Sequence, residues 1–280
     1  MIHPMRRTCG SLILRSAVVI AATLAVCAQS LAQTPAVSIK SKLVEITVEI
    51  DDAFKAHPGL YDNCLAEGRG WAEKMRGNAG KGQRDLPAAF RGVAWTYDRN
   101  YASRSVVGRY VSIVRTDDTF EGGAHPNSVI DTILWDGDAR KRISIRPFFK
   151  ETADNGPTMK ALAQLARLAV ASEKISRDIP VGGDDTLKAN MTPEQYLEAD
   201  TFINDGVKPA LLELGPVTLA PSTERGRSAG LTFHYSPYAV GPYVEGPYTV
   251  FVPWTKFRQF LSDEGAALFG GERPKDDEQK

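Results

Sequence analysis

The residues Phe-Glu-Gly-Gly-Ala-His-Pro-Asn at positions 120–127 form the segment that most constrains the fold of this chain. Two adjacent glycines, Gly122 and Gly123, permit positive φ angles or a very close backbone approach. Pro126 biases His125 towards an extended or turn conformation, and Asn127 suits a left-handed or capping position. We predict a tight loop in which Gly122, Gly123 and Pro126 are structural. His125 and Asn127 make its local hydrogen bonds in this interpretation, and they are also candidates for ligand contact.

A second segment, rich in tyrosine, proline and glycine, covers residues 234–248 and reads HYSPYAVGPYVEGPY. Its prolines fix the backbone, so tyrosines on it have little conformational entropy left to lose on binding. Rigid exposed tyrosines make good contacts with proteins and sugars. Tyr235 and Tyr248 lie in predicted strands and are expected in the core, with their hydroxyls tied to the loop backbone. The candidates for ligand contact are Tyr238 and Tyr243, and the structural positions are Gly241 and Gly246.

The first 32 residues have the pattern of a secretory signal peptide. A basic start is followed by the apolar run 16–28, which is shorter than the ~20 residues of a membrane-spanning helix. Small residues at 30 and 32 predict cleavage before Gln33, so we expect a periplasmic or secreted protein. The alternatives are an uncleaved membrane anchor and a lipid anchor on Cys27, although Val26 is bulky for lipoprotein processing.

The mature chain would keep one cysteine, Cys64, which excludes an internal disulfide. An exported chain without disulfides must be stabilised by its hydrophobic core, and about 250 residues suffice for one. The precursor has a net charge of 0, and removal of the three signal arginines leaves a charge of −3. This balance does not favour a nucleic-acid partner, although it is compatible with a cationic one.

The pattern of the first half predicts strands with one helix between them. Residues 43–50 alternate as a half-buried strand. A helix should follow Pro58, with an inner side formed by Cys64, Leu65, Trp71 and Met75, and residues 78–82 should form a loop. Further strands are predicted at 93–97 and 106–114, and a hairpin at 129–135 and 143–145.

The second half predicts two helices, two strands and a last helix. The clearest helix covers residues 157–174 and starts with Pro157. Thr192 to Gln195 form a predicted capping box. Strands are expected at 231–235 and 248–252, followed by an amphipathic helix that Thr255 caps and that buries Phe257, Phe260, Leu261 and Leu268. Because strands and helices mix without a βαβ rhythm, we predict the α+β class, a mostly antiparallel sheet packed with several amphipathic helices.

Residues that could carry chemistry are few. The mature chain has three histidines, His57, His125 and His234, and lacks the spaced ligand pairs and nucleophile motifs of common metal and hydrolase sites. We therefore expect no cofactor, no metal and no enzymatic activity. One alternative is a cryptic cell-wall hydrolase. Its composite site would consist of His125, His234 and one nearby carboxylate, such as Glu121, Asp131 or Glu245.

The two segments at 120–127 and 234–248 together resemble the RsiV-type extracytoplasmic domain, the sensor of a lysozyme-binding anti-sigma factor. The resemblance implies a PdaC-like companion region over 33–115 and an RsiV-like domain over 116–270. The residue pattern adds a signal peptide over 1–32 and a disordered polar tail over 271–280. Deacetylase activity is not expected, because the paired histidines of the metal-dependent catalytic domain that carries it are missing here. Only about 15 residues precede the apolar run, too few to fold around a sigma factor. The chain also departs from the family at 146–149, where an acidic residue is usual and Arg-Pro-Phe-Phe stands here.

The resemblance and the rigid tyrosines together favour a non-enzymatic binding module of the bacterial cell envelope. The expected partner is a lysozyme-like protein, and the alternative is peptidoglycan or another glycan. No nucleic-acid partner is expected. The membrane would be reached only through an uncleaved signal or a lipid anchor.

Overall fold

The computed structural model describes residues 34–87, 93–181 and 191–277. The predicted signal peptide and the alternative lipid anchor at Cys27 lie outside the described residues. None of the helices within these ranges is long and apolar enough to cross a membrane.

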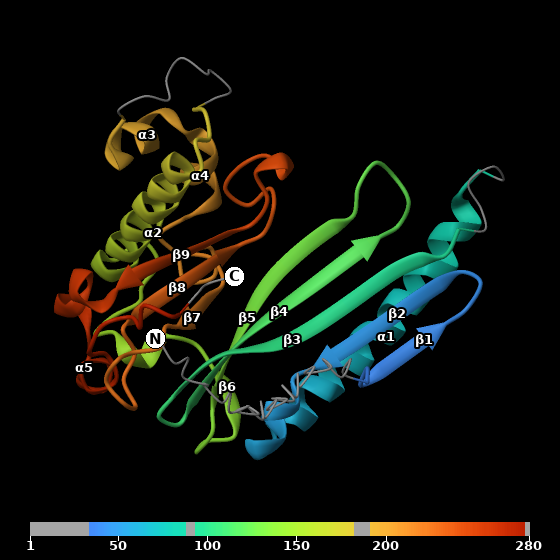
Figure 1. Cartoon of the computed structure of the whole chain (residues 1–280), viewed down its shortest axis with the longest axis horizontal. Helices are drawn as coiled ribbons and strands as arrows, with labels where there is room; N and C mark the ends of the chain where they lie inside the picture. The colour runs from blue at the N-terminus through green and yellow to red at the C-terminus, as the bar shows by residue number, and fades with distance from the viewer. Residues whose placement is uncertain (1–33, 88–92, 182–190, 278–280) are drawn as a thin grey trace, which may run out of the picture. The chain divides into compact units, whose positions relative to one another are not determined.

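A six-stranded sheet forms the first layer, in the order β1-β2-β3-β4-β5-β6 (Figure 1). Only the pairing of β2 with β3 is parallel, and every other neighbouring pair in this sheet is antiparallel. Together with the helices, this arrangement confirms the predicted α+β class. The strands are Val37–Lys40, Val44–Ile50, Trp95–Val107, Tyr110–Phe120, Asn127–Asp136 and Lys141–Ile143.

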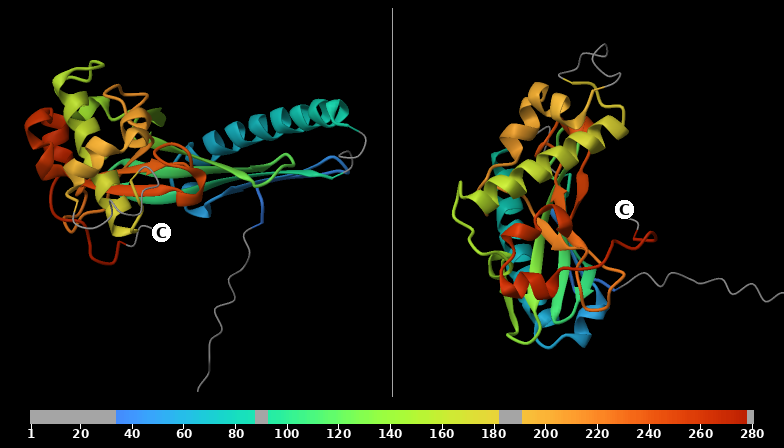
Figure 2. Two further views of the ribbon diagram at one scale, coloured as in Figure 1. Left: turned by 90° about the horizontal axis from the view of Figure 1, so that it is seen from above. Right: turned by 90° about the vertical axis from the view of Figure 1, so that its left-hand side faces the viewer.

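The helix α1 (Leu60–Asp85) follows the short 3-10 helix η1 (Asp52–Ala56) and lies along one face of this sheet (Figure 2). The alternation predicted for β2 is confirmed, because every second side chain from Val44 to Ile50 is buried. On the helix side Cys64 is buried as predicted. The other three predicted inner residues, Leu65, Trp71 and Met75, are only partly buried.

The predicted loop at residues 78–82 is wrong, because α1 continues through it to Asp85. The glycines of α1 allow a close approach to the sheet. A Cβ at Gly68 would lie 2.7 Å from a methyl group of Val48, and a Cβ at Gly82 would lie 2.4 Å from the Trp95 ring. Packing against the sheet therefore outweighs the low helix propensity of glycine here.

The strand predicted at 106–114 is confirmed only in part, since a turn divides it between β3 and β4. β3 and β4 form one long hairpin whose turn consists of Gly108 and Arg109, with Val107 paired to Tyr110. Gly108 has a φ of 57°, which a tight two-residue turn requires. The hairpin predicted after residue 129 is confirmed as β5 and β6, with Leu134 opposite Ile143, but its second strand is residues 141–143 and not the predicted 143–145.

The second layer is a three-stranded antiparallel sheet in the order β7-β8-β9, with α2 packed against β9. The predicted helix at 157–174, the capping box at Thr192 and the two predicted strands are confirmed. These elements are α2 (Pro157–Ser176), α3 (Pro193–Ala199), α4 (Thr201–Gly206), β7 (Val217–Leu219), β8 (Gly230–Tyr235) and β9 (Tyr248–Pro253).

The single amphipathic helix predicted after Thr255 is wrong. The chain there forms two short 3-10 helices, η6 (Trp254–Lys256) and η7 (Arg258–Phe260), and then α5 (Asp263–Leu268), which Ser262 caps. The predicted apolar residues still point inward, because Phe257, Leu261 and Leu268 are buried and Phe260 packs partly buried against the same core. Further on, Asp277 accepts two hydrogen bonds from Arg104 on β3, within the stretch predicted to be a tail.

Polar contacts join the two layers. The Ser105 hydroxyl donates to Leu219 O, and Leu219 N donates to the Ser112 hydroxyl. On β5, the Thr132 hydroxyl accepts from the backbone of β7, and Ile130 N donates to the Ser236 hydroxyl at 2.7 Å. The predicted domain boundary between residues 115 and 116 lies within β4, and the domain division stays a prediction.

Candidate ligand-binding surface

The two segments singled out in the sequence meet in the structure. The Tyr243 hydroxyl donates to Pro126 O at 2.9 Å, which joins the β4–β5 loop to the β8–β9 loop. The His125 ring stacks on the Tyr243 ring, with centroids 3.9 Å apart and planes 22° apart. Tyr238 completes the group, since its ring centroid lies 5.4 Å from that of Tyr243 and its hydroxyl 3.4 Å from His125 Nε2.

This group is open to solvent. His125 is exposed, Tyr238 is 57% exposed, and Tyr243 is half-buried. Val244 follows Tyr243 in the 3-10 helix η5 (Tyr243–Glu245) and is 90% exposed. We call these four residues, His125, Tyr238, Tyr243 and Val244, the aromatic surface. An exposed group of large apolar side chains is typical of an interaction site.

The backbone of both loops adopts conformations that few residues favour. Gly122 and Gly123 have φ values of 83° and 122°, and Gly246 has 73°, which confirms the predicted need for glycine at the first two positions. Tyr238 is held at a φ of 71°, which is unusual for a bulky residue. Such strain persists only where the surroundings enforce it, and it is found preferentially at functional sites.

A buried ion triad fixes the β8–β9 loop to the helices. Lys174 Nζ on α2 lies 2.9 Å from Asp200 Oδ2 and 3.1 Å from Glu245 Oε2. The three side chains are 1%, 5% and 10% exposed. Gly241 packs directly on this triad, because a Cβ there would lie 2.1 Å from Glu245 Oε2. The loop position of Glu245 is therefore set by charges that water does not screen.

Arg177, one helical turn after the triad lysine, adds a second anchor. It donates a hydrogen bond to Pro247 O at 3.1 Å, and its guanidinium lies 4.4 Å from the centroid of the Tyr248 ring. The Tyr248 hydroxyl donates to Glu245 Oε2 at 2.6 Å, and burial together with this carboxylate raises the pKa of Tyr248. Tyr238 and Tyr243 are thus displayed from a loop that is already ordered.

The other residues that were singled out in the two segments are not part of the aromatic surface. Tyr235 and Tyr248 are each 1% exposed, which confirms that they are core residues. Tyr235 donates to Leu214 O, a backbone group as predicted, whereas Tyr248 donates to a carboxylate. Asn127 is exposed and begins β5 opposite Thr119. The structure records no hydrogen bond of its side chain with the described residues.

The composite catalytic site considered from the sequence is not assembled. His125 Nδ1 lies 2.8 Å from Pro126 O and its ring contacts tyrosines, whereas His234 is buried between Thr218 and Thr249. Burial, and then the charge of Arg104, lowers the pKa of His234 to about 4.

The three candidate carboxylates have partners of their own. Glu121 accepts from the Tyr97 hydroxyl, and Asp131 accepts from Arg115. Glu245 belongs to the triad. Within the described ranges, no group of three or more His, Cys, Asp or Glu residues could hold a metal ion.

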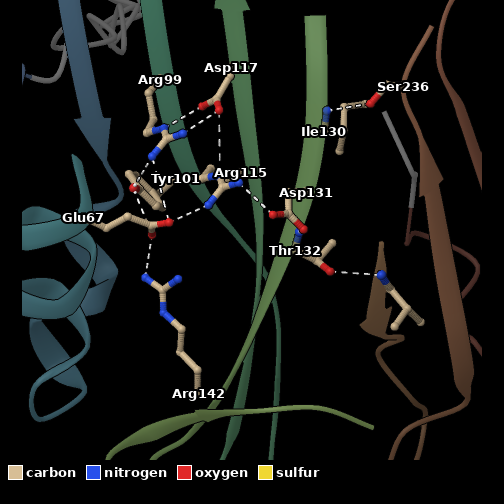
Figure 3. Close-up of polar contacts among 11 residues, drawn as sticks. Glu67, Arg99, Tyr101, Arg115, Asp117, Ile130, Asp131, Thr132, Arg142 and Ser236 are labelled. Carbon is tan, nitrogen blue, oxygen red and sulfur yellow. Dashed lines mark hydrogen bonds and ion pairs between the residues drawn. The ribbon is translucent and has the colours of Figure 1, made fainter. Parts of the chain in front are cut away.

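Sequence reasoning missed a charged network between α1 and the first sheet (Figure 3). Glu67 on α1 accepts hydrogen bonds from Arg115 at 2.6 Å and Arg142 at 2.5 Å, and Arg99 makes two hydrogen bonds to Asp117. Burial alone would raise the pKa of Glu67, but the hydrogen bond from Arg142 and the two arginine charges outweigh it and lower the pKa.

A signal for this network was present in β3. Arg99 stands between Tyr97 and Tyr101 on the buried side of the alternating strand, where an unpaired charge is very costly. An arginine at such a position indicates a nearby acid. The network ties α1 to the four strands β3–β6, and the loop that carries His125 joins the end of β4 to the start of β5.

The comparisons with known proteins concern the fold. A crystal structure of a DUF3298 family member from Bacteroides fragilis is similar over 81% of this chain and 91% of that chain, with a TM-score of 0.51 and 14% identity. A second, from Pseudomonas aeruginosa, is similar over 84% and 91%, with a TM-score of 0.50 and 16% identity. No curated protein matches the chain. Residues 153–255 match the family described as "Protein of unknown function (DUF3298)". This part of the chain, which is similar to DUF3298 domains, includes α2, β8, β9 and the loop with Tyr238 and Tyr243.

Proposed function

We propose that this chain is a non-enzymatic binding module of the bacterial cell envelope and that the aromatic surface contacts its ligand. One observation carries the proposal: exposed rings from two distant segments meet on a loop that a buried ion triad holds in place. Such a surface loses little entropy on binding, which favours affinity. The export signal read from the first 32 residues supports the envelope location.

A protein ligand of the lysozyme type is the first candidate. The resemblance of residues 120–127 and 234–248 to the RsiV-type sensor supports it, and tyrosines are enriched at the centres of protein interfaces. The charge of −3 expected for the mature chain is compatible with a cationic partner.

The test is a calorimetric titration of the chain from Gln33 with a panel of purified lysozymes. We expect saturable binding that the double substitution Tyr238→Ala and Tyr243→Ala weakens at least tenfold. The matched control is Tyr61→Ala, a half-buried tyrosine on α1 away from the aromatic surface. The lysozyme assignment fails if no member of the panel binds at about 100 μM, which corresponds to roughly 5.5 kcal/mol.

A glycan ligand is the second candidate, and the exposure of the Tyr238 ring favours it, since sugars stack on open aromatic faces. It predicts that the chain co-sediments with purified cell-wall sacculi. The same double substitution should reduce the sedimented fraction, with Tyr61→Ala again as the control. Equal sedimentation of the wild type and the double variant would remove the aromatic surface as the glycan site.

A further inference from the structure

The first sheet has one face that α1 does not cover. Successive side chains of a strand point to opposite faces. On β4, Arg115 points to Glu67 of α1, whereas Ser112 lies on the opposite face and bonds to β7. Figure 2 shows α1 on one side of this sheet. On the other side, β7 covers the end near Ser112, and the remainder of that face carries exposed side chains on β3 and β4, such as Asp98 and Asp118.

The strand register brings the polar residues of this open face into rows. Thr47 on β2 lies opposite Asp98 on β3, Asp98 lies opposite Asp118 on β4, and Asp118 lies opposite Ser128 on β5. In the next row, Glu49 lies opposite Asn100. We call this surface the acidic face, and it consists of Thr47, Glu49, Asp98, Asn100, Asp118 and Ser128.

The three carboxylates of the acidic face are free of partners among the described residues. Glu49, Asp98 and Asp118 make no hydrogen bond and no ion pair there. Their neighbour Glu45 differs, because it pairs with Lys40 at 2.7 Å. The negative charge of the acidic face is therefore not neutralised within the described chain.

The placement of Asp98 and Asp118 works against the stability of the sheet. Side chains that lie directly opposite on antiparallel strands have Cβ atoms about 4.5–5.5 Å apart, and like charges at such a pair are destabilising. Proteins keep such violations of local preference mainly at functional sites. A cationic group bound between the two carboxylates would convert their repulsion into attraction to the partner.

The acidic face adjoins the aromatic surface along β5. Ser128 is the second residue of β5, which begins directly after the loop that carries His125. The Ser236 hydroxyl accepts from Ile130 N, so the loop that carries Tyr238 is held against the same strand (Figure 3). A single partner is therefore able to contact both surfaces.

We propose that the acidic face docks a basic protein, whose lysine or arginine side chains pair with Asp98, Asp118 and Glu49. This inference rests on the proposed binding function and specifies its partner as a protein with a cationic surface, in place of an uncharged glycan. Complementary charge at the edge of an interface mainly accelerates association and makes it sensitive to salt. The aromatic surface then supplies the contacts that slow dissociation.

The first test uses a fluorescein-labelled octalysine peptide, titrated with the chain from Gln33 at low ionic strength and followed by fluorescence anisotropy. Asp98→Asn combined with Asp118→Asn should weaken binding about tenfold. The melting temperature of this variant should not fall, because the substitutions remove a like-charge pair. The matched control, Glu194→Gln with Glu198→Gln, removes two charges from exposed positions of α3 and should leave the affinity within about twofold.

The second test follows the binding kinetics of a basic lysozyme from the panel and separates this inference from the proposed function. The Asp98 and Asp118 double variant should slow association about tenfold and reduce its salt dependence. The Tyr238 and Tyr243 double variant should instead accelerate dissociation. If the tyrosines matter and the two aspartates do not, the acidic face is overturned and the proposed function stands. If octalysine binds as predicted but no lysozyme does, the lysozyme assignment fails and the acidic face stands.

Three other results would overturn the proposal. One is that octalysine does not bind at low ionic strength. Another is that the aspartate variant and the α3 control weaken it equally, which would show attraction to net charge alone. The third is saturable calcium binding that the aspartate substitutions abolish while neither basic probe binds, which would assign the carboxylates to a metal cation.

Discussion

Replacing Lys174 with methionine tests the role of the buried triad. The substitution keeps the aliphatic volume but removes the ammonium group from between Asp200 and Glu245, which are 5% and 10% exposed. Breaking a buried ion pair by removing one partner costs about 3–5 kcal/mol, because the remaining charges stay buried. At about 2–4 °C per kcal/mol for a chain of this size, the melting temperature should fall by roughly 6–20 °C.

The assay is thermal unfolding followed by circular dichroism, with Lys208→Met as the matched control. Lys208 pairs with Asp205 at 3.1 Å, but the two side chains are 41% and 82% exposed. A solvent-exposed pair contributes about 0–1 kcal/mol, so the control should hardly change the melting temperature. If Lys174→Met costs no more than Lys208→Met, the triad does not hold the loop, and our account of the ordered tyrosines is wrong.

Three further predictions concern the helix, the buried histidine and the glycine loop. Gly82→Ala should destabilise the fold by about 1–3 kcal/mol, because its Cβ would meet the Trp95 ring. Gly80→Ala, whose Cβ would have nothing within 4 Å, should stabilise the fold by about 1 kcal/mol. Equal effects of the two substitutions in urea unfolding would contradict the close approach of α1 to the sheet. The pKa of His234 is about 4 in the fold, below the ~6.5 of an unfolded chain. The contribution of neutral His234 to the free energy of unfolding should therefore be fully present above pH 6.5 and fall by up to about 3 kcal/mol as the pH drops to 4. His234→Gln should flatten this part of the stability curve, and an unchanged slope would refute the assignment. Gly123→Ala should cost about 1 kcal/mol or more at its φ of 122°, and an unchanged melting temperature would show that the loop relaxes.

The sequence pattern correctly predicted those helices and strands in which local propensity and tertiary packing favour the same structure. The alternation of β2 and the apolar stripe of α2 appear in the structure as predicted. The end of α1 could not be predicted in this way, because glycine disfavours helix locally and only the contact of Gly82 with Trp95 explains its presence. The turn at Gly108 was hidden because residues that favour strands, such as valine, tyrosine and isoleucine, stand directly on both sides of Gly108 and Arg109.

The candidate surface was predictable in its parts but not as a whole. His125, Tyr238 and Tyr243 could be chosen separately, from loop chemistry and from proline spacing. Their contact depends on the packing of β5 against the second sheet, which joins residues more than a hundred positions apart. The pairing of Lys174 with Glu245 was equally inaccessible, since each charge taken alone resembles an ordinary surface residue.

The most direct test of the central claim is hydrogen–deuterium exchange of the chain from Gln33 with and without a saturating ligand from the lysozyme panel. The account predicts that protection concentrates in two peptides, those that cover residues 121–127 and 236–246, which carry the aromatic surface. The helix α1 should exchange equally in both states. Protection confined to other parts of the chain, with these two loops unchanged, would contradict the assignment of the aromatic surface as the ligand site.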